Sequence, residues 1–320
     1  MSNTRRAIIL IVAPPLAAAI ASIVALLALA PRLPDPLATH WGFNGEINGT
    51  GSVASVIGLT AVFVPLFTAA VLVVFLLMSR GRSSSLFTRL IVATSVFVGV
   101  LIALIPLTFV IPQLGLSAGE TFDSIVLVPW IVGVFVVSGV VATAMALLVP
   151  TTAVIEGDAA GAPAISLGAG EKAYWARTVA PHTAVIAIPI AALVIETVVL
   201  TLVGLPWWVP LIVDLVIVLA ASTLVWRVVI DDRGARARAL FGVPRFSIPL
   251  SAVSGAQQVE VHAMKFGGWG IRVDAQGRWG VIIRSGDAIE IVRRDKAPFV
   301  ITVDDAATGA ALLNGLARRA

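Results

Sequence analysis

The sequence predicts an α-helical multi-pass membrane protein with six transmembrane helices and a separate C-terminal domain of β-strands closed by one helix. Three observations predict this class. The 320 residues are 58% hydrophobic and 12% charged, with a mean hydropathy of +1.00, whereas about a quarter of the residues of a soluble domain are charged. Apolar runs long enough to cross a hydrocarbon core of about 30 Å recur up to residue 226. Beyond that point they give way to short β-type runs separated by turn residues.

Six apolar runs make up the predicted transmembrane domain, residues 1–227. They cover about residues 7–30, 53–78, 87–111, 125–149, 183–203 and 207–226. The first run is too long for a cleavable secretory signal, and Pro31 stands directly after the small residues that would be cut, so we expect a retained helix. Within this helix, Pro14 and Pro15 remove two backbone donors, which predicts a kink that serves packing.

Lysine and arginine in the short loops predict the orientation. One side of the membrane carries Arg5, Arg6, Arg80, Arg82, Arg89, Lys172, Arg177 and Arg227. The other side carries only Arg32. Because basic loops stay in the cytoplasm, we expect both termini on the cytoplasmic side of the cell membrane (inner or plasma membrane). Residues 31–52 then form an extracytoplasmic loop and residues 150–180 a cytoplasmic loop, in which residues 157–170 are expected to be a flexible connector. Trp226, at the inner end of the last run, is expected to be an interfacial anchor.

Residues 228–320 are predicted to form the cytoplasmic domain. The expected strands are residues 228–230, 237–241, 246–248, 258–261, 270–273, 279–284, 288–292 and 299–303. A helix is expected over residues 304–319, where Asp304 or Asp305 can cap its start. Its apolar face carries Leu312, Leu313 and Leu316.

Two carboxyl groups lie in the middle of the last two apolar runs. Glu196 and Asp214 stand nine residues before and nine after Leu205, which lies in the turn at residues 204–206. Because an α-helix rises about 1.5 Å per residue, both acids are expected roughly 13 Å below the same membrane surface. An ionised group in hydrocarbon costs several kcal/mol unless it is paired, hydrated or protonated. The pair is therefore a candidate intramembrane proton or cation site.

A structural interpretation of the same two acids stays open. Each acid can be protonated and hydrogen-bonded to a threonine, a serine or a freed backbone carbonyl. Pro189 leaves the carbonyl of Val185 without its helical donor, and Thr197 and Thr201 are near Glu196 in the sequence.

The loop at residues 31–52 is dense in proline, glycine and asparagine, which favours an ordered compact loop. It carries Leu33-Pro34-Asp35-Pro36, Thr39-His40-Trp41, Gly45-Glu46 and Gly49-Thr50-Gly51-Ser52. With these motifs, about the first 80 residues resemble domain of unknown function 1648, which is found in membrane proteins that include the immunity protein against a sporulation-delaying toxin. The chain departs from that immunity protein after this segment. The candidate ligand-binding residues are His40, Trp41 and Glu46, and the alternative for His40 is a histidine that holds a turn.

The C-terminal segment resembles small bacterial PH-like domains that are attached to membrane proteins. The residues that carry the resemblance are Ile248-Pro249-Leu250, Gly267-Gly268-Trp269-Gly270-Ile271-Arg272, Ser285-Gly286 and Thr302-Val303-Asp304-Asp305. The resemblance implies a binding or assembly module rather than a catalyst. Three basic residues near its start, Arg233, Arg236 and Arg238, are candidates for contact with anionic lipid of the bilayer, and a solvated edge is the alternative.

Several classes of function are excluded by composition. The chain has no cysteine and three scattered histidines, so we expect neither a metal site nor a cofactor. Neither a catalytic triad nor a nucleotide-binding loop has convincing spacing, so we do not expect an enzyme. Nucleic acid is not an expected partner.

Three hypotheses of function remain. In the first, the protein is a sensor, binding or immunity-type protein: a peptide or envelope ligand meets the extracytoplasmic loop, and the cytoplasmic domain reports by binding a protein partner or a second copy. In the second, it is a small proton- or cation-coupled transporter that uses Glu196 and Asp214. In the third, it is a structural scaffold for envelope proteins.

Overall fold

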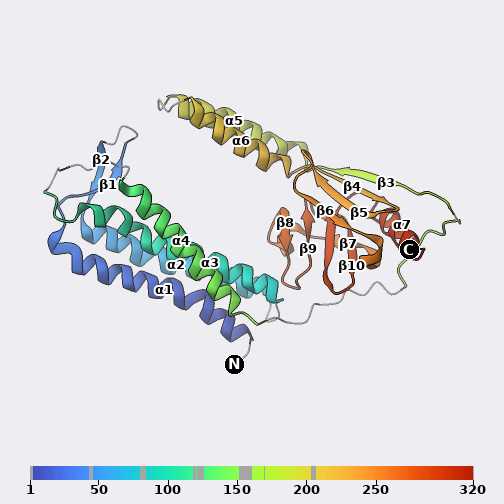
Figure 1. Ribbon diagram of the computed structural model, residues 1–320, viewed down its shortest axis with the longest axis horizontal. Helices are drawn as coiled ribbons and strands as arrows, with labels where there is room; N and C mark the ends of the chain where they lie inside the picture. The colour runs from blue at the N-terminus through green and yellow to red at the C-terminus, as the bar shows by residue number, and fades with distance from the viewer. Residues whose placement is uncertain are drawn as a thin grey trace. The chain divides into compact units, whose positions relative to one another are not determined.

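The computed structural model describes residues 3–42, 46–79, 84–117, 120, 126–150, 161–168, 170–202 and 207–319. The chain divides into two compact units, Met1–Thr152 and Ala153–Ala320, and Figure 1 shows helices in the first and helices with β-sheets in the second. Within the described residues, five helices are long and apolar enough to cross a membrane: Asn3–Arg32, Val53–Ser79, Ser85–Gln113, Leu127–Leu147 and Val185–Leu202. These helices and the C-terminal sheets confirm a multi-pass membrane protein with a sheet-rich C-terminal domain.

The first unit is a helical bundle with a small hairpin of strands. Its elements are α1 (Asn3–Leu29), η1 (Ala30–Arg32), β1 (Leu37–Trp41), β2 (Ile47–Gly51), α2 (Val53–Ser79), α3 (Ser85–Val110), η2 (Ile111–Gln113) and α4 (Leu127–Leu147). Helices α1, α2 and α4 all pack on α3. Helix α3 accordingly buries Val92, Val96, Val100 and Ala103, which lie along one stripe of the helix.

Pro15 of α1 lies at the contact of this helix with α3. Pro15 has no N–H, so the carbonyl of Ile11 lacks its helical donor. The hydroxyl of Ser95 on α3 donates to that carbonyl over 2.9 Å. One turn further along α3, a Cβ on Gly99 would lie 2.7 Å from the Cβ of Pro15. Pro15 therefore packs closely on α3, and this approach requires glycine at position 99.

The second unit contains a helical hairpin, two sheets and a closing helix. Its elements are β3 (Trp175–Val179), α5 (Thr183–Leu202), α6 (Trp208–Ser222), β4 (Trp226–Asp231), β5 (Gly234–Ala239), β6 (Arg245–Ile248), η4 (Leu250–Ala252), β7 (Val253–Val261), η5 (Ala263–Phe266), β8 (Gly270–Val273), β9 (Trp279–Ile282), β10 (Gly286–Arg293), β11 (Lys296–Thr302) and α7 (Ala306–Ala317). All eight strands expected after residue 228 are present, with boundaries shifted by a few residues.

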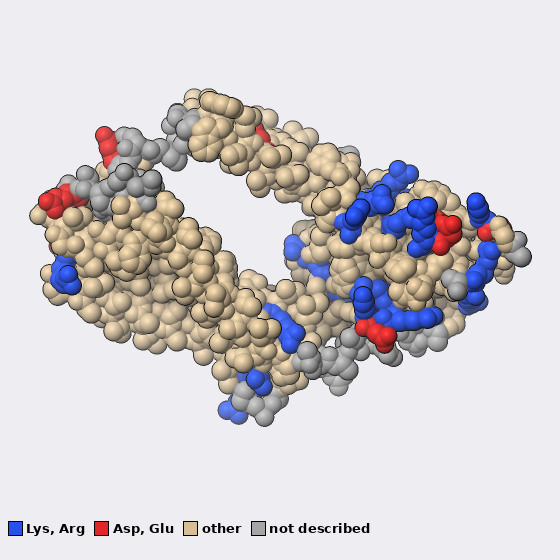
Figure 2. Space-filling model, viewed as in Figure 1, with Lys and Arg blue, Asp and Glu red and all other residues tan. Residues whose placement is uncertain are grey.

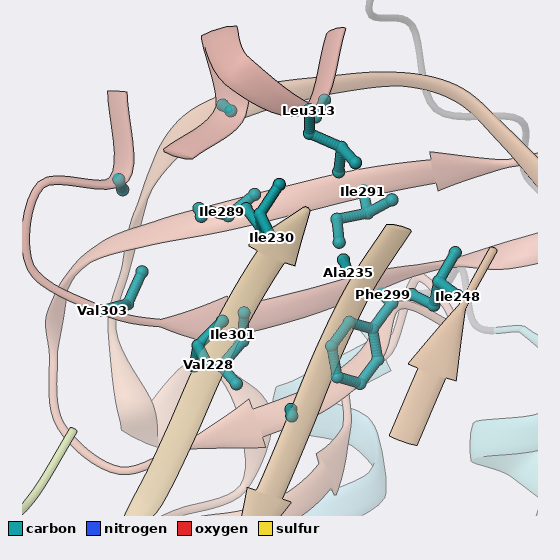
Figure 3. Close-up of a cluster of buried hydrophobic side chains, with 14 of the residues drawn as sticks. Val228, Ile230, Ala235, Ile248, Ile289, Ile291, Phe299, Ile301, Val303 and Leu313 are labelled. Carbon is teal, nitrogen blue, oxygen red and sulfur yellow. The ribbon is translucent and has the colours of Figure 1, made fainter. Parts of the chain in front are cut away.

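The strands form two hydrogen-bonded sheets. The first has the order β3-β4-β5-β6 and is antiparallel throughout, and the second has the order β7-β10-β11-β9-β8, in which β9 and β11 are parallel. Figure 3 shows the core between them: Val228 and Ile230 come from the first sheet, Ile291 and Phe299 from the second, and Leu313 from α7. The apolar face predicted for the last helix is confirmed, since its three leucines are buried.

The boundary of the C-terminal domain differs from the predicted one at residue 228. Strand β3 comes from the segment expected to be a cytoplasmic loop, and it pairs with β4 from Trp175 opposite Ile230 to Val179 opposite Trp226. The structure therefore inserts the α5–α6 hairpin between two neighbouring strands of one sheet. The signal was weak because β3 is short and stands alone between a glycine-rich stretch and an apolar run.

Residues 157–170 were expected to be a flexible connector, but the described part of this segment packs on α7. Residues 163–165 dock on α7: Ile165 N donates to Ala311 O over 3.0 Å, and Asn314 Nδ2 donates to Pro163 O over 2.8 Å. The same asparagine bonds both backbone groups of Ala256 on β7. One side chain on α7 thus fixes a passing segment to the second sheet. Residues 151–160 lie outside the described part of the chain.

Trp226 is not an interfacial anchor. It is fully buried in the core of the domain, where it stacks on Phe246 with ring centroids 5.6 Å apart and an interplanar angle of 6°. The reason is that α6 ends at Ser222, so that Trp226 is the first residue of β4 rather than the last residue of a helix predicted to span 207–226. Its indole Nε1 donates to the carbonyl of Thr223 over 2.6 Å.

Asp305 joins β3 to the start of α7. It is the N-cap residue, with a left-handed φ of 58°, and its carboxylate accepts from Thr308 Oγ1 over 2.5 Å, from Trp175 Nε1 over 3.2 Å and from Arg177 Nη2 over 2.5 Å. The hydrogen bonds from Thr308 and Trp175, together with the Arg177 cation, hold the pKa of Asp305 below its ordinary value. This stabilisation is present above the ordinary aspartate pKa and is lost as the pH falls through the lower folded-state value.

Candidate functional site

The two acids predicted to lie within the membrane are on the α5–α6 hairpin, whose helices pack side by side (Figure 1). Thr197 on α5 directs its hydroxyl at Asp214 on α6, with 3.2 Å to each carboxylate oxygen. Glu196 is the residue next to Thr197, and both of its carboxyl oxygens are buried. The two acids therefore lie at matching positions along the hairpin, as expected from their equal distance in sequence from Leu205. The turn itself, residues 203–206, lies outside the described part of the chain.

Glu196 lies near Asp214, and two neighbouring ionised carboxylates repel each other. Among the described residues, neither buried oxygen of Glu196 makes a hydrogen bond. Thr197 supplies one O–H donor, and Thr201 uses its hydroxyl to bond the carbonyl of Thr197 over 2.7 Å. The arrangement can hold one shared proton, or a small cation, between two helices. The structural interpretation, in which each acid is hydrogen-bonded to a neighbouring polar group, holds for Asp214, because Thr197 donates to it.

The predicted loop site lies on the β1–β2 hairpin. His40 and Glu46 are exposed and Trp41 is half-buried. His40 Nδ1 lies 2.5 Å from Asn48 Oδ1 across the hairpin, and a Cβ on Gly49 would lie 2.8 Å from the Cβ of His40. His40 therefore links β1 to β2, which is the structural role given above as the alternative to ligand binding. Its side chain is still exposed to solvent. Residues 43–45, between Trp41 and Glu46, lie outside the described part.

Gln113 fixes this hairpin to the bundle. Its buried side chain accepts from Ala38 N through Oε1 and donates to Ala38 O through Nε2, each over 2.8 Å. Nε2 also donates to Phe109 O on α3 over 2.8 Å. Beneath it, Leu37 packs with Leu26 and Val110 in a buried cluster. Sequence reasoning missed Gln113; the available signal was a lone amide at the end of an otherwise apolar run.

The three candidate lipid-contact arginines do not form one group. Arg236 and Arg238 lie on β5 and point to the same outer face of the first sheet, whereas Arg233 lies in the turn after β4, where its N–H donates to Asp231 Oδ1 over 3.0 Å. Arg236 forms an ion pair with Asp231. The strand register brings Arg227 and Arg245 to Arg238 instead. These two were missed as partners because their proximity depends on strand pairing, which adjacency in sequence does not reveal.

Comparison with known proteins gives one finding. Residues 17–64 match the family described as Domain of unknown function (DUF1648). The match runs from the middle of α1 through the β1–β2 hairpin into α2, and it confirms the resemblance of the N-terminal segment. Neither a curated protein nor a solved structure matches the chain.

Proposed function

We propose that this protein is a membrane sensor or binding protein in which the bundle carrying the β1–β2 hairpin receives a ligand and the sheet-rich domain reports it. One observation carries the proposal: the α5–α6 hairpin is inserted between β3 and β4, which are hydrogen-bonded neighbours. Only residues 180–182 separate β3 from α5, and only residues 223–225 separate α6 from β4. Any tilt or separation of the two helices therefore acts directly on one pair of strands.

The same insertion supports the proposed topology of six spans. Because β3 and β4 are neighbours in one sheet, the start of α5 and the end of α6 lie on the same side of the membrane. Helix α5 is long enough to cross, so α6 must return, although its helix from Trp208 to Ser222 is only about 22 Å long. With the basic loops inside, both termini and the sheet-rich domain are cytoplasmic, in the cell membrane, and the β1–β2 hairpin is extracytoplasmic.

The proposed fold of the C-terminal domain is PH-like. Its support is an antiparallel four-stranded sheet packed on a second sheet, followed by one C-terminal helix that covers the core. A domain of this kind acts by binding a protein partner or a second copy, which suits a reporting role. No enzymatic step is proposed.

Coupling between the hairpin and the sheet is tested by neutralising the acids. The variant E196Q/D214N keeps the side-chain shapes and removes both negative charges. We expect amide hydrogen exchange in β3 and β4 to change by about tenfold, the equivalent of about 1.4 kcal/mol, because the altered helix packing acts on this strand pair. Exchange is measured by mass spectrometry on the full chain in detergent.

Strands β10 and β11 provide the internal control, and V199T, which changes an exposed side chain on the same helix, provides the matched variant. Unchanged exchange in β3 and β4, or an equal change in β10 and β11, would show that the hairpin does not act on the sheet edge.

A second function, proton- or cation-coupled transport, is favoured by the two buried carboxyl oxygens of Glu196 near Asp214 on a pair of apolar helices. We expect proteoliposomes with the wild-type chain to conduct protons under an imposed potential at least about ten times faster than those with E196Q/D214N, since a shared carboxyl proton is the carrier. A pH-sensitive dye trapped in the vesicles measures the flux, with V199T as control. Wild-type flux equal to that of protein-free vesicles would exclude proton transport and leave the sensor proposal standing.

A further inference from the structure

Three arginines stand side by side across the outer face of the first sheet. Arg227 on β4 is directly opposite Arg238 on β5, and Arg238 is directly opposite Arg245 on β6. Neighbouring strands lie about 4.8 Å apart, so the three side chains start from a row about 10 Å wide. All three are exposed, and Figure 2 shows basic side chains gathered over this sheet. Like charges that stand opposite each other destabilise a sheet, so an anion bound to the row would stabilise it.

Ion pairing separates this arginine row from its neighbour Arg236. Arg236 is paired with Asp231. Across the described ranges, by contrast, no carboxylate lies within ion-pair distance of Arg227, Arg238 or Arg245. Two members of the row, Arg227 and Arg238, line a groove of about 470 Å³. The side chains that line the groove include Tyr174, Thr178, Arg227, Arg236, Arg238 and Leu240. Guanidinium and hydroxyl donors around one groove match the oxygens of a phosphate group.

An apolar turn adjoins the arginine row. Between β5 and β6, Leu240, Phe241 and Val243 are 60%, 59% and 73% exposed. The turn lies beside the end of a membrane helix, because Leu240 N donates to the carbonyl of Ser222, the last residue of α6, over 3.3 Å. Arg227 follows Ser222 by five residues, which span at most about 18 Å. The exposed apolar turn and the arginine row therefore share the end of the sheet from which α6 emerges.

We infer that this end of the first sheet is a binding surface for anionic lipid headgroups. The turn at residues 240–243 enters the apolar edge of the bilayer, and the arginine row binds phosphate groups of the surrounding lipids. A soluble phosphate would match the arginines alone, whereas a lipid also accounts for the exposed apolar turn and for the contact with α6. Arg233, at the opposite end of β4, does not belong to this surface. The inference stands apart from the ligand of the β1–β2 hairpin and from the reporting role proposed above.

The test uses a fluorophore on the thiol of the variant F241C, which is unique because the chain has no cysteine. The full chain in non-ionic detergent micelles is titrated with phosphatidylglycerol. We expect a blue shift that saturates, because the turn and the bound lipid come together. A basic residue at a membrane surface contributes about fivefold to the apparent affinity. We therefore expect R238Q to weaken half-saturation about fivefold and R227Q/R238Q/R245Q to weaken it about a hundredfold.

Two control proteins and two control ligands decide the outcome. The variant R272Q/R294Q/R318Q removes the same charge from exposed positions elsewhere and should leave the titration unchanged, and a fluorophore on M264C, also exposed, should report no shift. Equal weakening by both triple variants would overturn the inference, as would a titration by phosphatidylcholine equal to that by phosphatidylglycerol. A full shift produced by inorganic phosphate alone would assign the row to a soluble anion instead. The single variant R238Q keeps the test valid if the triple variant fails to fold.

Discussion

Replacing Gly315 by alanine is expected to release residues 162–167 from helix α7. A Cβ at this position would lie 2.3 Å from the carbonyl oxygen of Ile165, a backbone atom that cannot yield without moving the segment. Overpacking of this kind costs about 3 kcal/mol, which corresponds to about a hundredfold faster exchange of the Ile165 amide. Hydrogen exchange of the peptide covering residues 161–168, measured on the full chain, gives the result directly.

A307S serves as the matched variant, because it adds one heavy atom to α7 at an exposed position. It should leave exchange in residues 161–168 unchanged. If G315A gave the exchange rate of the wild type, the docking of this segment on α7 would be wrong.

The variant G99L is expected to separate helix α1 from helix α3. The first atom of the added side chain would lie 2.7 Å from Cβ and 2.9 Å from Cγ of Pro15, and the Ser95–Ile11 hydrogen bond lies one turn away. We expect a loss of about 3 kcal/mol, and hence a fall of about 10 °C in the apparent Tm of the protein in detergent. Size-exclusion chromatography after heating measures it.

G58L is the control for the effect of a leucine in a membrane helix. Gly58 lies in α2, and no heavy atom lies within 4 Å of the position where its Cβ would be. Leucine there should leave the Tm unchanged. Equal Tm losses in G58L and G99L would contradict the close contact between α1 and α3.

Membrane helices and short strands were predictable because their signals are local. A helix that crosses the membrane must satisfy its backbone hydrogen bonds internally and expose apolar side chains, so the runs that became α1 to α4 stand out in the sequence. The strands after residue 228 are bounded by Asp-Arg-Gly, Gln-Gly-Arg and Ser-Gly-Asp turns, which mark strand ends. Of the two residues predicted to cap α7, Asp304 and Asp305, the second is the N-cap, although its side chain bonds the hydroxyl of Thr308 rather than a backbone N–H.

Long-range pairing explains what the sequence did not reveal. Strand β3 is stabilised by pairing with β4, which follows two helices later in the sequence. Its five residues are too few to show a strand pattern on their own. The same holds for the arginine row, since Arg227 and Arg245 meet Arg238 only through strand register. Of the candidate site, the matched positions of Glu196 and Asp214 could be counted from the turn. The donor Thr197 was named only as a sequence neighbour, because which side of α5 faces α6 is settled by helix packing.

The insertion of the hairpin between β3 and β4 also orders events during biosynthesis. Strand β3 leaves the ribosome before both helices, and its partner β4 leaves after them. The Val179–Trp226 pair can therefore form only after the whole α5–α6 segment has been synthesised. Until then neither the sheet edge nor the core around Trp226 can close, since a non-local pairing must wait for its later strand. Closure of this domain thus requires that the α5–α6 hairpin has already been made.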